Sequence, residues 1–332
     1  MNHMTDLPLC PLSGESMRVW MRMPIDPVTG YPSEYGTVFY SDKSGYGMVF
    51  PRPSPGEIEG FYDLPAYYTH QHNQPTDSSP TGARPFWLRI LDRLRMRIAF
   101  ELHPLEATIG SCLRELPKKE FRHVLDVGCG AGGLMQELHQ AGYSVVGIEQ
   151  DCHAHSFQLG LPVYQGTAEV IPAQVQCQQF DAIIMSHVLE HCLDPIKALE
   201  NLYQLLRPGG YFICEVPNND CLGLKFAGVT WSMLDMPRHL NFFTPTSLVS
   251  MLEKIGLQSK KLAFRGYYRQ FTNSWIDYEA SVYDRLLQSG QTAQPWPRRN
   301  SPLRAWKLLL ATIFAPPEGR YDSVRAIAQR PY

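Results

Sequence analysis

A group of glycines behind an aspartate is the first feature of the sequence that could bind a ligand. In HVLDVGCGAGGLMQEL, residues 123–138, an apolar run leads to Asp126, followed by Gly128, Gly130, Gly132 and a helix-like pattern. Glycine lets the backbone turn sharply and approach a ligand closely, so the segment predicts a binding loop between a strand and a helix. Its letters fit both G-x-G-x-G and the dinucleotide spacing G-x-G-x-x-G, which leaves the ligand undecided.

A second acidic residue supports a binding site. The apolar stretch YSVVGIE ends in Glu149. A carboxylate at the end of a neighbouring parallel strand can accept hydrogen bonds from both hydroxyls of a ribose. Both glycine spacings predict such a residue, so Glu149 does not decide between them.

Three histidines are candidates for acid–base chemistry. His187 and His191 stand four residues apart in HVLEH, and His239 stands in MPRHLNFFTP. Histidine is the natural general base near neutral pH. With Glu190 between them, the first two also form a metal-ligand hypothesis. No Ser-His-Asp or Cys-His pattern predicts a nucleophilic side chain.

The segments around these residues alternate between apolar strands and amphipathic helices. We predict strands at 122–127, 144–149, 162–165, 180–185, 210–215, about 257–266 and 322–331, and helices at 132–141, 152–159, 194–206 and 245–255. A mostly helical insertion at about 270–318 precedes the last strand. This order predicts a doubly wound α/β fold, in which helices cover both faces of a parallel sheet.

The first part of the chain has a different composition. Residues 1–68 contain glycine, proline and short segments such as GTVFY and GMVF, which predict a small β module. The polar residues 69–85 predict a linker, and 86–332 the main domain. Helical spacing over 86–116, interrupted at Pro104, predicts an amphipathic helix. Its exposed face is expected to be the basic one, which carries Arg89, Arg93, Arg95 and Arg97.

The bulk composition limits the classes of function. Lysine and arginine total 30 against 32 acidic residues, a formal charge of −2, which offers no broad positive field for nucleic acid or anionic lipid. No apolar segment is long enough to span a bilayer. We therefore expect a cytoplasmic protein that acts on a small molecule, without a stable membrane association. Its eight cysteines lack framework spacing and are expected to be reduced.

The stretch 180–218 distinguishes the two glycine spacings. FDAIIMSHVLEHCLDPIKALENLYQLLRPGGYFICEVPN contains a strand, a polar loop, a helix, a Pro-Gly-Gly turn and another strand. With VLDVGCGAG and the acid that ends the second strand, it resembles the class I S-adenosylmethionine-dependent methyltransferases, in the subgroup of the ubiquinone-biosynthesis enzymes and their small-molecule relatives. The resemblance spans about 120–266. It implies a Rossmann-like seven-stranded sheet and S-adenosylmethionine as the cofactor.

The resemblance also implies roles for individual residues. In the family pattern the loop surrounds the methionine part of the cofactor and the acid of the second strand holds the ribose. The implied cofactor contacts are Asp126, Gly128, Gly130, Gly132, Glu149, Gln150, Thr167, Ala168, Ser186 and His187. Thr167 stands where the family commonly has an aspartate, so that adenine contact departs from the pattern.

The candidate bases follow from the same resemblance. A Pro-x-His-x-x-x-Phe pattern implies that His239 faces the active site, with His191 as the alternative base. Some ubiquinone-pathway relatives bind a divalent ion through an acidic pair and a histidine, but here His187 replaces the first acid, so we expect no metal. Tyr67 and Tyr68 resemble a segment that closes over the cofactor, with packing onto the β module as the alternative.

The N-terminal module resembles the zinc ribbon of some sugar C-methyltransferases, in which two C-x-x-C pairs hold the metal. Here Cys10 remains, and Ser13, Ser41 and Ser44 occupy the other positions. A serine hydroxyl is a poor zinc ligand, so we expect a degenerate module without zinc. So small a module must pack against the core or another subunit, and a homodimer would provide the latter.

Together these observations predict the transfer of a methyl group from S-adenosylmethionine to a small acceptor. O- or C-methylation of a sugar, phenolic or secondary-metabolite intermediate would fit. A catalytically inactive scaffold with the same fold and an NAD-dependent oxidoreductase are the alternatives, and the second should lack HVLEH and LRPGG. Neutral charge and the lack of an Asn-Pro-Pro-Tyr motif disfavour an RNA or protein methyltransferase.

Overall fold

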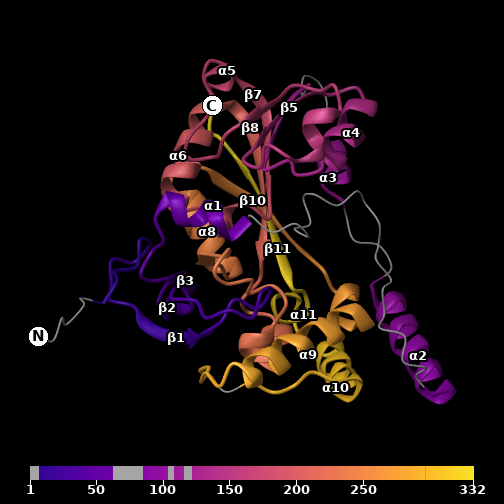
Figure 1. The fold of residues 1–332 in the computed structure, drawn as a ribbon. Coiled ribbons are helices and arrows are strands. Elements are labelled where there is room, and N and C mark those ends of the chain that lie inside the picture. Colours follow the sequence, from indigo (N-terminus) through magenta and orange to yellow (C-terminus); the bar gives the residue numbers. More distant parts are fainter. Residues whose placement is uncertain (1–6, 63–84, 104–107, 116–121, 296) are drawn as a thin grey trace, which may run out of the picture.

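A computed structural model describes residues 7–62, 85–103, 108–115, 122–295 and 297–332. Its centre is a seven-stranded sheet in the order β10-β11-β8-β7-β4-β5-β6 (Figure 1). The pairs from β8 to β6 are parallel, and β11 runs antiparallel to β8 and β10. The strands are β4 (His123–Val127), β5 (Ser144–Glu149), β6 (Val163–Gln165), β7 (Phe180–Ser186), β8 (Leu206–Pro217), β10 (Gln258–Arg265) and β11 (Ser323–Gln329).

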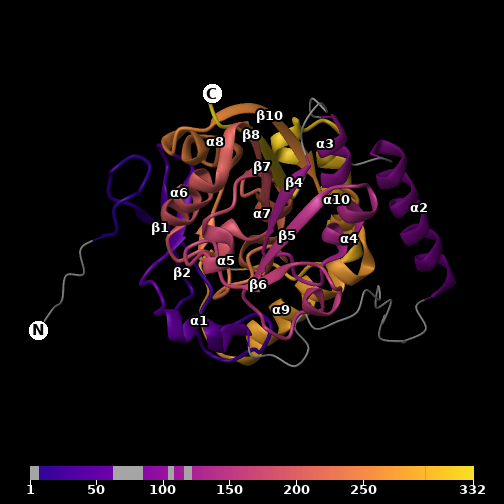
Figure 2. The same ribbon diagram turned by 90° about the horizontal axis from the view of Figure 1, so that it is seen from above.

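Alternating side chains of the central strands enter two separate cores. Leu125 and Ile183 belong to the core beneath α6 (Pro195–Leu205) and α8 (Pro245–Lys254). Val124 and Ile184 belong to the core beneath α3 (Ile109–Glu115) and α4 (Gly133–Gln140). Successive side chains of a strand point to opposite faces, so a sheet with helices on both sides needs apolar residues at nearly every strand position. Figure 2 shows the helices on the two sides, and the predicted doubly wound class is confirmed.

The N-terminal strands share a second sheet with a distant segment. Its antiparallel order is β1-β2-β3-β9. Here β1 is Arg18–Arg22, β2 Thr37–Ser41, β3 Tyr46–Val49 and β9 Asn241–Phe242. Because β9 lies just after His239, the first part of the chain packs against the segment that carries this histidine. The domain boundaries at 68 and 85 remain predictions, and residues 69–84 of the proposed linker lie outside the described part.

The four positions of the proposed ribbon lie together in space. Cys10 Sγ is 3.2 Å from Ser44 Oγ, and Ser13 Oγ is 3.3 Å from Ser41 Oγ. Two hydrogen-bonded pairs therefore join the loop around residue 11 to the β2–β3 turn. Thiol and hydroxyl groups can form both pairs, and the absence of zinc remains a prediction.

The helical insertion before the last strand is present as predicted, whereas one of the predicted helices is much shorter than expected. Between β10 and β11 lie η5 (Tyr268–Phe271), α9 (Asn273–Gln288), α10 (Pro302–Ile313) and α11 (Pro317–Arg320). The helix expected at 152–159 is only a short 3-10 turn, η2 (His155–Gln158), and α1 (Pro55–Tyr62) and α7 (Leu222–Ala227) are further short helices. No described helix is both long enough and apolar enough to cross a bilayer.

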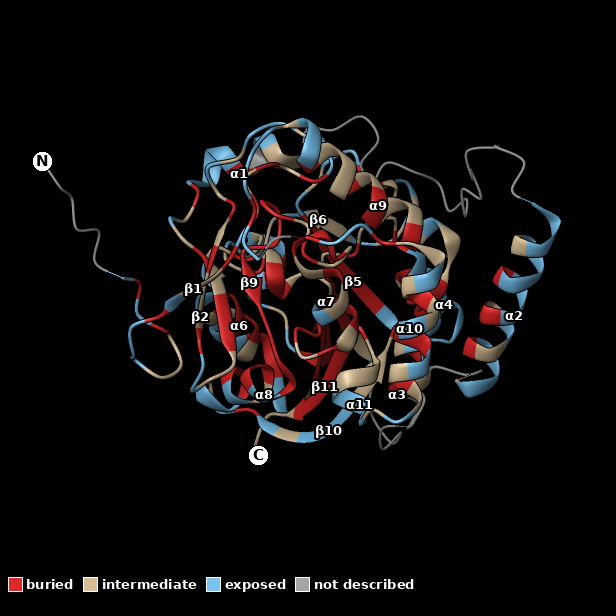
Figure 3. Ribbon diagram, turned by 90° about the horizontal axis from the view of Figure 1, so that it is seen from below, coloured by how far each residue is buried: buried red, intermediate tan, exposed pale blue. Residues whose placement is uncertain are grey.

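The orientation expected for the first long helix is only partly right: Arg89, Arg93 and Arg97 are exposed as expected, but Arg95 and the apolar stripe are not where the prediction placed them. In α2 (Phe86–Leu102) Arg95 is buried, whereas Trp87 and Leu94 are exposed. Figure 3 shows α2 with much of its ribbon in the colour of exposed residues. The guanidinium of Arg95 pairs with Asp92 at 3.0 Å and donates to the carbonyl oxygen of Phe271 at 3.0 Å. The inward face of α2 combines these polar contacts with apolar packing, in which Ala99 joins a small core with Tyr267 and Leu309.

Candidate active site

Three strands deliver the predicted binding residues to one edge of the sheet. Asp126 lies near the end of β4, Glu149 ends β5 and Ser186 ends β7. In open α/β sheets the carboxyl ends of parallel strands line the ligand-binding crevice. The predicted cofactor residues therefore come together from segments 60 positions apart.

The glycine loop is shaped by positive backbone angles. Gly128, Gly130 and Gly132 have φ values of +67°, +52° and +80°. A Cβ on Gly128 would lie 2.3 Å from Val188 Cγ2, so the loop packs directly against the segment after β7. A Cβ on Gly130 would meet no described heavy atom within 4 Å. Gly130 is thus the point at which a ligand has room to approach the backbone.

Two carboxylates sit beside this loop in a poorly solvated place. Glu149 accepts hydrogen bonds from the backbone N–H groups of Gly130 (2.7 Å) and Asp151 (3.0 Å). Burial raises the pKa of Glu149, and burial together with the charge of Glu149 raises the pKa of Asp126 to about 7. Buried carboxylates without a cation are costly, so the pair suits a ligand with a cationic group and hydroxyl donors.

The implied adenine contacts are less uniform. Gln150 is exposed, Thr167 is half-buried and Ala168 is buried. The Thr167 hydroxyl already accepts the backbone N–H of Val170 at 3.0 Å, and the Ala168 carbonyl accepts from Asn201 Nδ2 at 3.0 Å. Thr167 therefore holds its own turn, and its contact with a cofactor remains a prediction.

His187 is a cation and not a base. Its Nδ1 lies 3.2 Å from Glu190 Oε1 and its Nε2 3.4 Å from Glu215 Oε1. Burial opposes the charged form, but the two carboxylates outweigh it and raise the pKa of His187 to about 9. At neutral pH the imidazolium therefore bridges the ends of β7 and β8. Glu215, which also accepts from Arg325 Nε at 2.7 Å, did not figure in the sequence prediction.

The other two histidines face each other. The ring centroids of His191 and His239 are 4.5 Å apart, and burial lowers the pKa of each to about 4, with His239 adding to the effect on His191. The Nδ1 of His239 faces the carbonyl of Met233 at 2.9 Å and that of His191 the carbonyl of Arg238 at 3.1 Å. Carbonyl oxygens only accept, so in His239 Nδ1 carries the proton and Nε2 keeps its lone pair. The Nδ1 of His191 also lies 2.8 Å from the hydroxyl of Tyr62, which can donate to it, so either neutral tautomer of His191 fits its contacts. Both imidazoles are neutral at pH 7.

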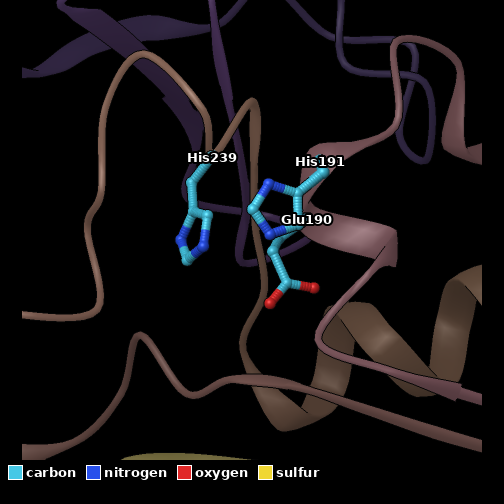
Figure 4. Close-up of side chains that lie close together, drawn as sticks. All are labelled: Glu190, His191 and His239. Atoms are coloured by element: carbon cyan, nitrogen blue, oxygen red, sulfur yellow. The ribbon is translucent and has the colours of Figure 1, made fainter. Parts of the chain in front are cut away.

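Glu190 completes this group (Figure 4). One ligand atom from each of Glu190, His191 and His239 lies within 4.8 Å of the others. Glu190 is buried, and its Oε2 has no hydrogen-bond partner among the described residues. Two neutral imidazoles and a carboxylate can bind a divalent ion. The sequence analysis weighed a metal site made of His187, Glu190 and His191 and expected no metal there. In the structure the third residue of the group is His239 instead of His187.

Tyr62 is a further site residue that the sequence prediction missed. Its hydroxyl lies 2.8 Å from Nδ1 of His191. It closes α1, five residues before Tyr67, and Tyr67 and Tyr68 themselves lie outside the described residues. The tyrosine-rich character of FYDLPAYY was the available signal, but only the fold selects which tyrosine reaches the histidines.

Comparison with known proteins places this geometry in a family. Residues 101–261 match the model of a methyltransferase domain. A ubiquinone biosynthesis O-methyltransferase of Ruegeria pomeroyi is 31% identical over 177 residues, which are 49% of this chain and 68% of that protein. The chain belongs to the class I S-adenosylmethionine-dependent methyltransferases.

Two further relatives set the extent of the likeness. The corresponding O-methyltransferase of Cereibacter sphaeroides strain KD131 is 30% identical over 156 residues, 43% of this chain. The chain spans 62% of that relative's length. A crystal structure of an S-adenosylmethionine-dependent methyltransferase from Thermotoga maritima aligns with a TM-score of 0.45 at 19% identity, over 74% of this chain and 96% of that one.

The residues of this methyltransferase fit the cofactor of its family. S-adenosylmethionine carries a cationic sulfonium and ammonium group and a ribose with two hydroxyls. Buried Asp126 and Glu149 supply negative charge and hydrogen-bond acceptors, and Gly130 leaves room at the loop. A buried cationic group is stable only where negative charge and hydrogen-bond acceptors lie close to it, and Asp126 and Glu149 meet that requirement.

Proposed function

We propose that this methyltransferase transfers the methyl group of S-adenosylmethionine to a hydroxyl oxygen of a small molecule, with a phenolic or quinone-like acceptor as the first candidate class. The observation that carries the proposal is the pair of neutral imidazoles, His191 and His239. His191 stands three residues after Val188, the residue against which Gly128 of the glycine loop packs. The O-methyltransferase names of the relatives support oxygen over carbon. A sugar acceptor and C-methylation are less supported.

The cofactor supplies an activated methyl, so the chain needs to position an acceptor and take up its proton. With the cofactor bound, the acceptor hydroxyl would give up its proton to Nε2 of His239, or to the unprotonated ring nitrogen of His191, as methyl transfer leaves S-adenosylhomocysteine. Glu190, which is buried and ionised, stabilises the imidazolium that results. His187 is already protonated and holds Glu190 and Glu215 in place.

A methyl-transfer assay tests the proposal directly. The purified protein is incubated with S-adenosylmethionine and catechols, simple phenols or sugar nucleotides, and products are detected by mass spectrometry. We expect methylated phenols, and His239→Gln should lower kcat about 10²–10⁴-fold while its affinity for S-adenosylhomocysteine stays unchanged. Glu253→Gln, an exposed change on α8, is the matched control. S-adenosylmethionine binding without turnover of any acceptor would favour the inactive scaffold.

The three-ligand group favours a second candidate for the same step, in which a divalent ion bound by Glu190, His191 and His239 polarises the acceptor hydroxyl. Treatment with a chelator separates the candidates. A base mechanism retains its activity after chelation, whereas a metal mechanism loses it and regains it on addition of Mg²⁺, Mn²⁺ or Zn²⁺.

A further inference from the structure

The α2 helix presents its apolar side to solvent. Its buried residues include Asp92 and Arg95, while Phe86, Trp87 and Leu94 are 74%, 61% and 46% exposed. Arg95 Nη2 also donates to Asn273 Oδ1 at 2.8 Å, beside its contacts with Asp92 and Phe271. A buried guanidinium is stable only while its hydrogen bonds and its ion pair are kept. The contacts of Arg95 therefore fix which side of α2 faces the protein. The outward apolar stripe is therefore a fixed feature of the surface.

The neighbouring helix α10 adds to this surface. It packs against α2 and exposes Leu303, Leu310 and Phe314, the last at 91%. The two helices lie at one end of the molecule (Figure 1). Exposed apolar groups of this size are uncommon on a soluble monomer and mark a surface that binds something. We use the name α2–α10 face for the exposed side chains of these two adjacent helices, which are Phe86, Trp87, Arg89, Ile90, Leu91, Arg93, Leu94, Arg97, Leu303, Lys307, Leu310 and Phe314.

The charge of the α2–α10 face indicates what it binds. Its cations are Arg89, Arg93, Arg97 and Lys307, all exposed. Residues 285–317 contain no aspartate or glutamate, and Asp92 of α2 is buried. Glu101 near the end of α2 is exposed and lies 4.0 Å from Arg97, so four exposed cations face one exposed carboxylate on the described residues of these two helices. In a chain of net charge −2 this is a marked local excess of positive charge. Apolar side chains interleaved with arginine are typical of helices that lie in the plane of a membrane surface.

We propose that the α2–α10 face docks reversibly on a membrane that carries anionic lipids. Phe86, Trp87 and Leu94 would enter the headgroup region, and the arginines would contact lipid phosphates. A second copy of the chain is a poorer occupant, because a twofold contact would bring the same arginine rows together. This association differs from the sequence expectation of no stable membrane association, which rested on the net charge of the whole chain and treated the basic face of this helix as a solvated one.

Co-sedimentation of the full chain with vesicles tests the proposal. We expect binding to vesicles of phosphatidylcholine with phosphatidylglycerol, and binding at least about tenfold weaker to phosphatidylcholine alone or at high salt. The double variant Trp87→Ser with Leu94→Ser should lose about tenfold or more in partition, and Arg93→Glu about fivefold. Tyr31→Ser and Lys260→Glu, exposed changes elsewhere, are the controls and should bind like the unmodified chain.

Thermal unfolding and S-adenosylhomocysteine binding show whether each variant is folded. Equal binding by the double variant and the unmodified chain would overturn the proposal, as would equal binding to neutral and anionic vesicles. So would a lack of vesicle binding combined with a dimer, seen by sedimentation velocity, that the double variant abolishes. In that case a second copy covers the face.

Discussion

In this site the protonation state of each titratable side chain is determined by its burial and by a few close neighbours. The carboxylate of Glu149 offers about four lone pairs, which accept the N–H groups of Gly130 and Asp151 and also interact with the backbone of Gln150. The remaining lone pairs are free to accept ribose hydroxyls. This division explains why a residue that also holds the loop can bind the cofactor.

Replacement of Glu149 should therefore weaken cofactor binding more than it disturbs the fold. Glu149→Gln removes the charge from the hydrogen bonds to the ribose, and we expect S-adenosylhomocysteine to bind about tenfold or more weakly, measured by isothermal titration calorimetry. The exposed Glu253→Gln should bind like the unmodified protein. An unchanged affinity in Glu149→Gln would remove this residue from the cofactor site.

The raised pKa of His187 predicts a pH-dependent contribution to stability. The folded-state pKa is about 9 and the ordinary value 6.5, so the folded chain binds more protons between these values. The stabilisation is complete below pH 6.5 and is lost as the pH rises through 9. In urea unfolding, His187→Gln should be less stable than the unmodified chain at pH 6, and the difference should shrink by pH 9.5. The exposed His139→Gln should show no such trend, and a constant difference for His187→Gln would contradict the ion-pair assignment.

At the scale of elements, two glycines with positive φ allow the effect of backbone strain to be distinguished from the effect of lost ligand contact. Gly130 and Gly142 both have positive φ, +52° and +89°, and a Cβ on either would meet no described atom within 4 Å. Alanine at either position should cost about 1–2 kcal/mol of stability, measured by chemical denaturation. Only Gly130→Ala should also lower the affinity for S-adenosylhomocysteine, because its methyl group would point into the cofactor's space. Equal affinities in the two variants would argue against a close approach at Gly130.

Elements that are buried on both sides were predictable from the sequence, and contacts between distant segments were not. The strand FDAIIMS was predicted as β7 because nearly all its side chains enter one of two cores. The outward face of α2 was misjudged because helical spacing identifies a stripe but not which stripe the fold covers. The pairing of His191 with His239 depends on the irregular segment between β8 and β9, for which no periodicity exists. Tyr62 entered the site through the same kind of long-range packing.

At the scale of the whole molecule, the N-terminal sheet and the active site are one structural unit. Asn241 accepts from Tyr46 and Arg52 through Oδ1, at 2.6 Å each, and donates through Nδ2 to the carbonyl of Cys192 at 2.6 Å. The amide therefore ties the N-terminal strands to the loop after His191. Packing and this network hold the N-terminal strands in place, as a module without a metal would require.

A buried ion pair gives the sharpest test of that coupling. Arg238 is fully buried, adjoins His239 and contacts Asp26 of the N-terminal region at 2.8 Å and Asp235 at 2.7 Å. Asp26→Asn leaves the guanidinium with one carboxylate, so we expect a loss of about 2–4 kcal/mol in urea unfolding and faster amide exchange over 233–241. Asp42→Asn, which breaks the exposed pair with Arg18 in the same sheet, should change neither measurement appreciably. If Asp26→Asn destabilised the N-terminal strands but left exchange at 233–241 unaltered, the two sheets would be independent, and the N-terminal module would have no part in positioning His239.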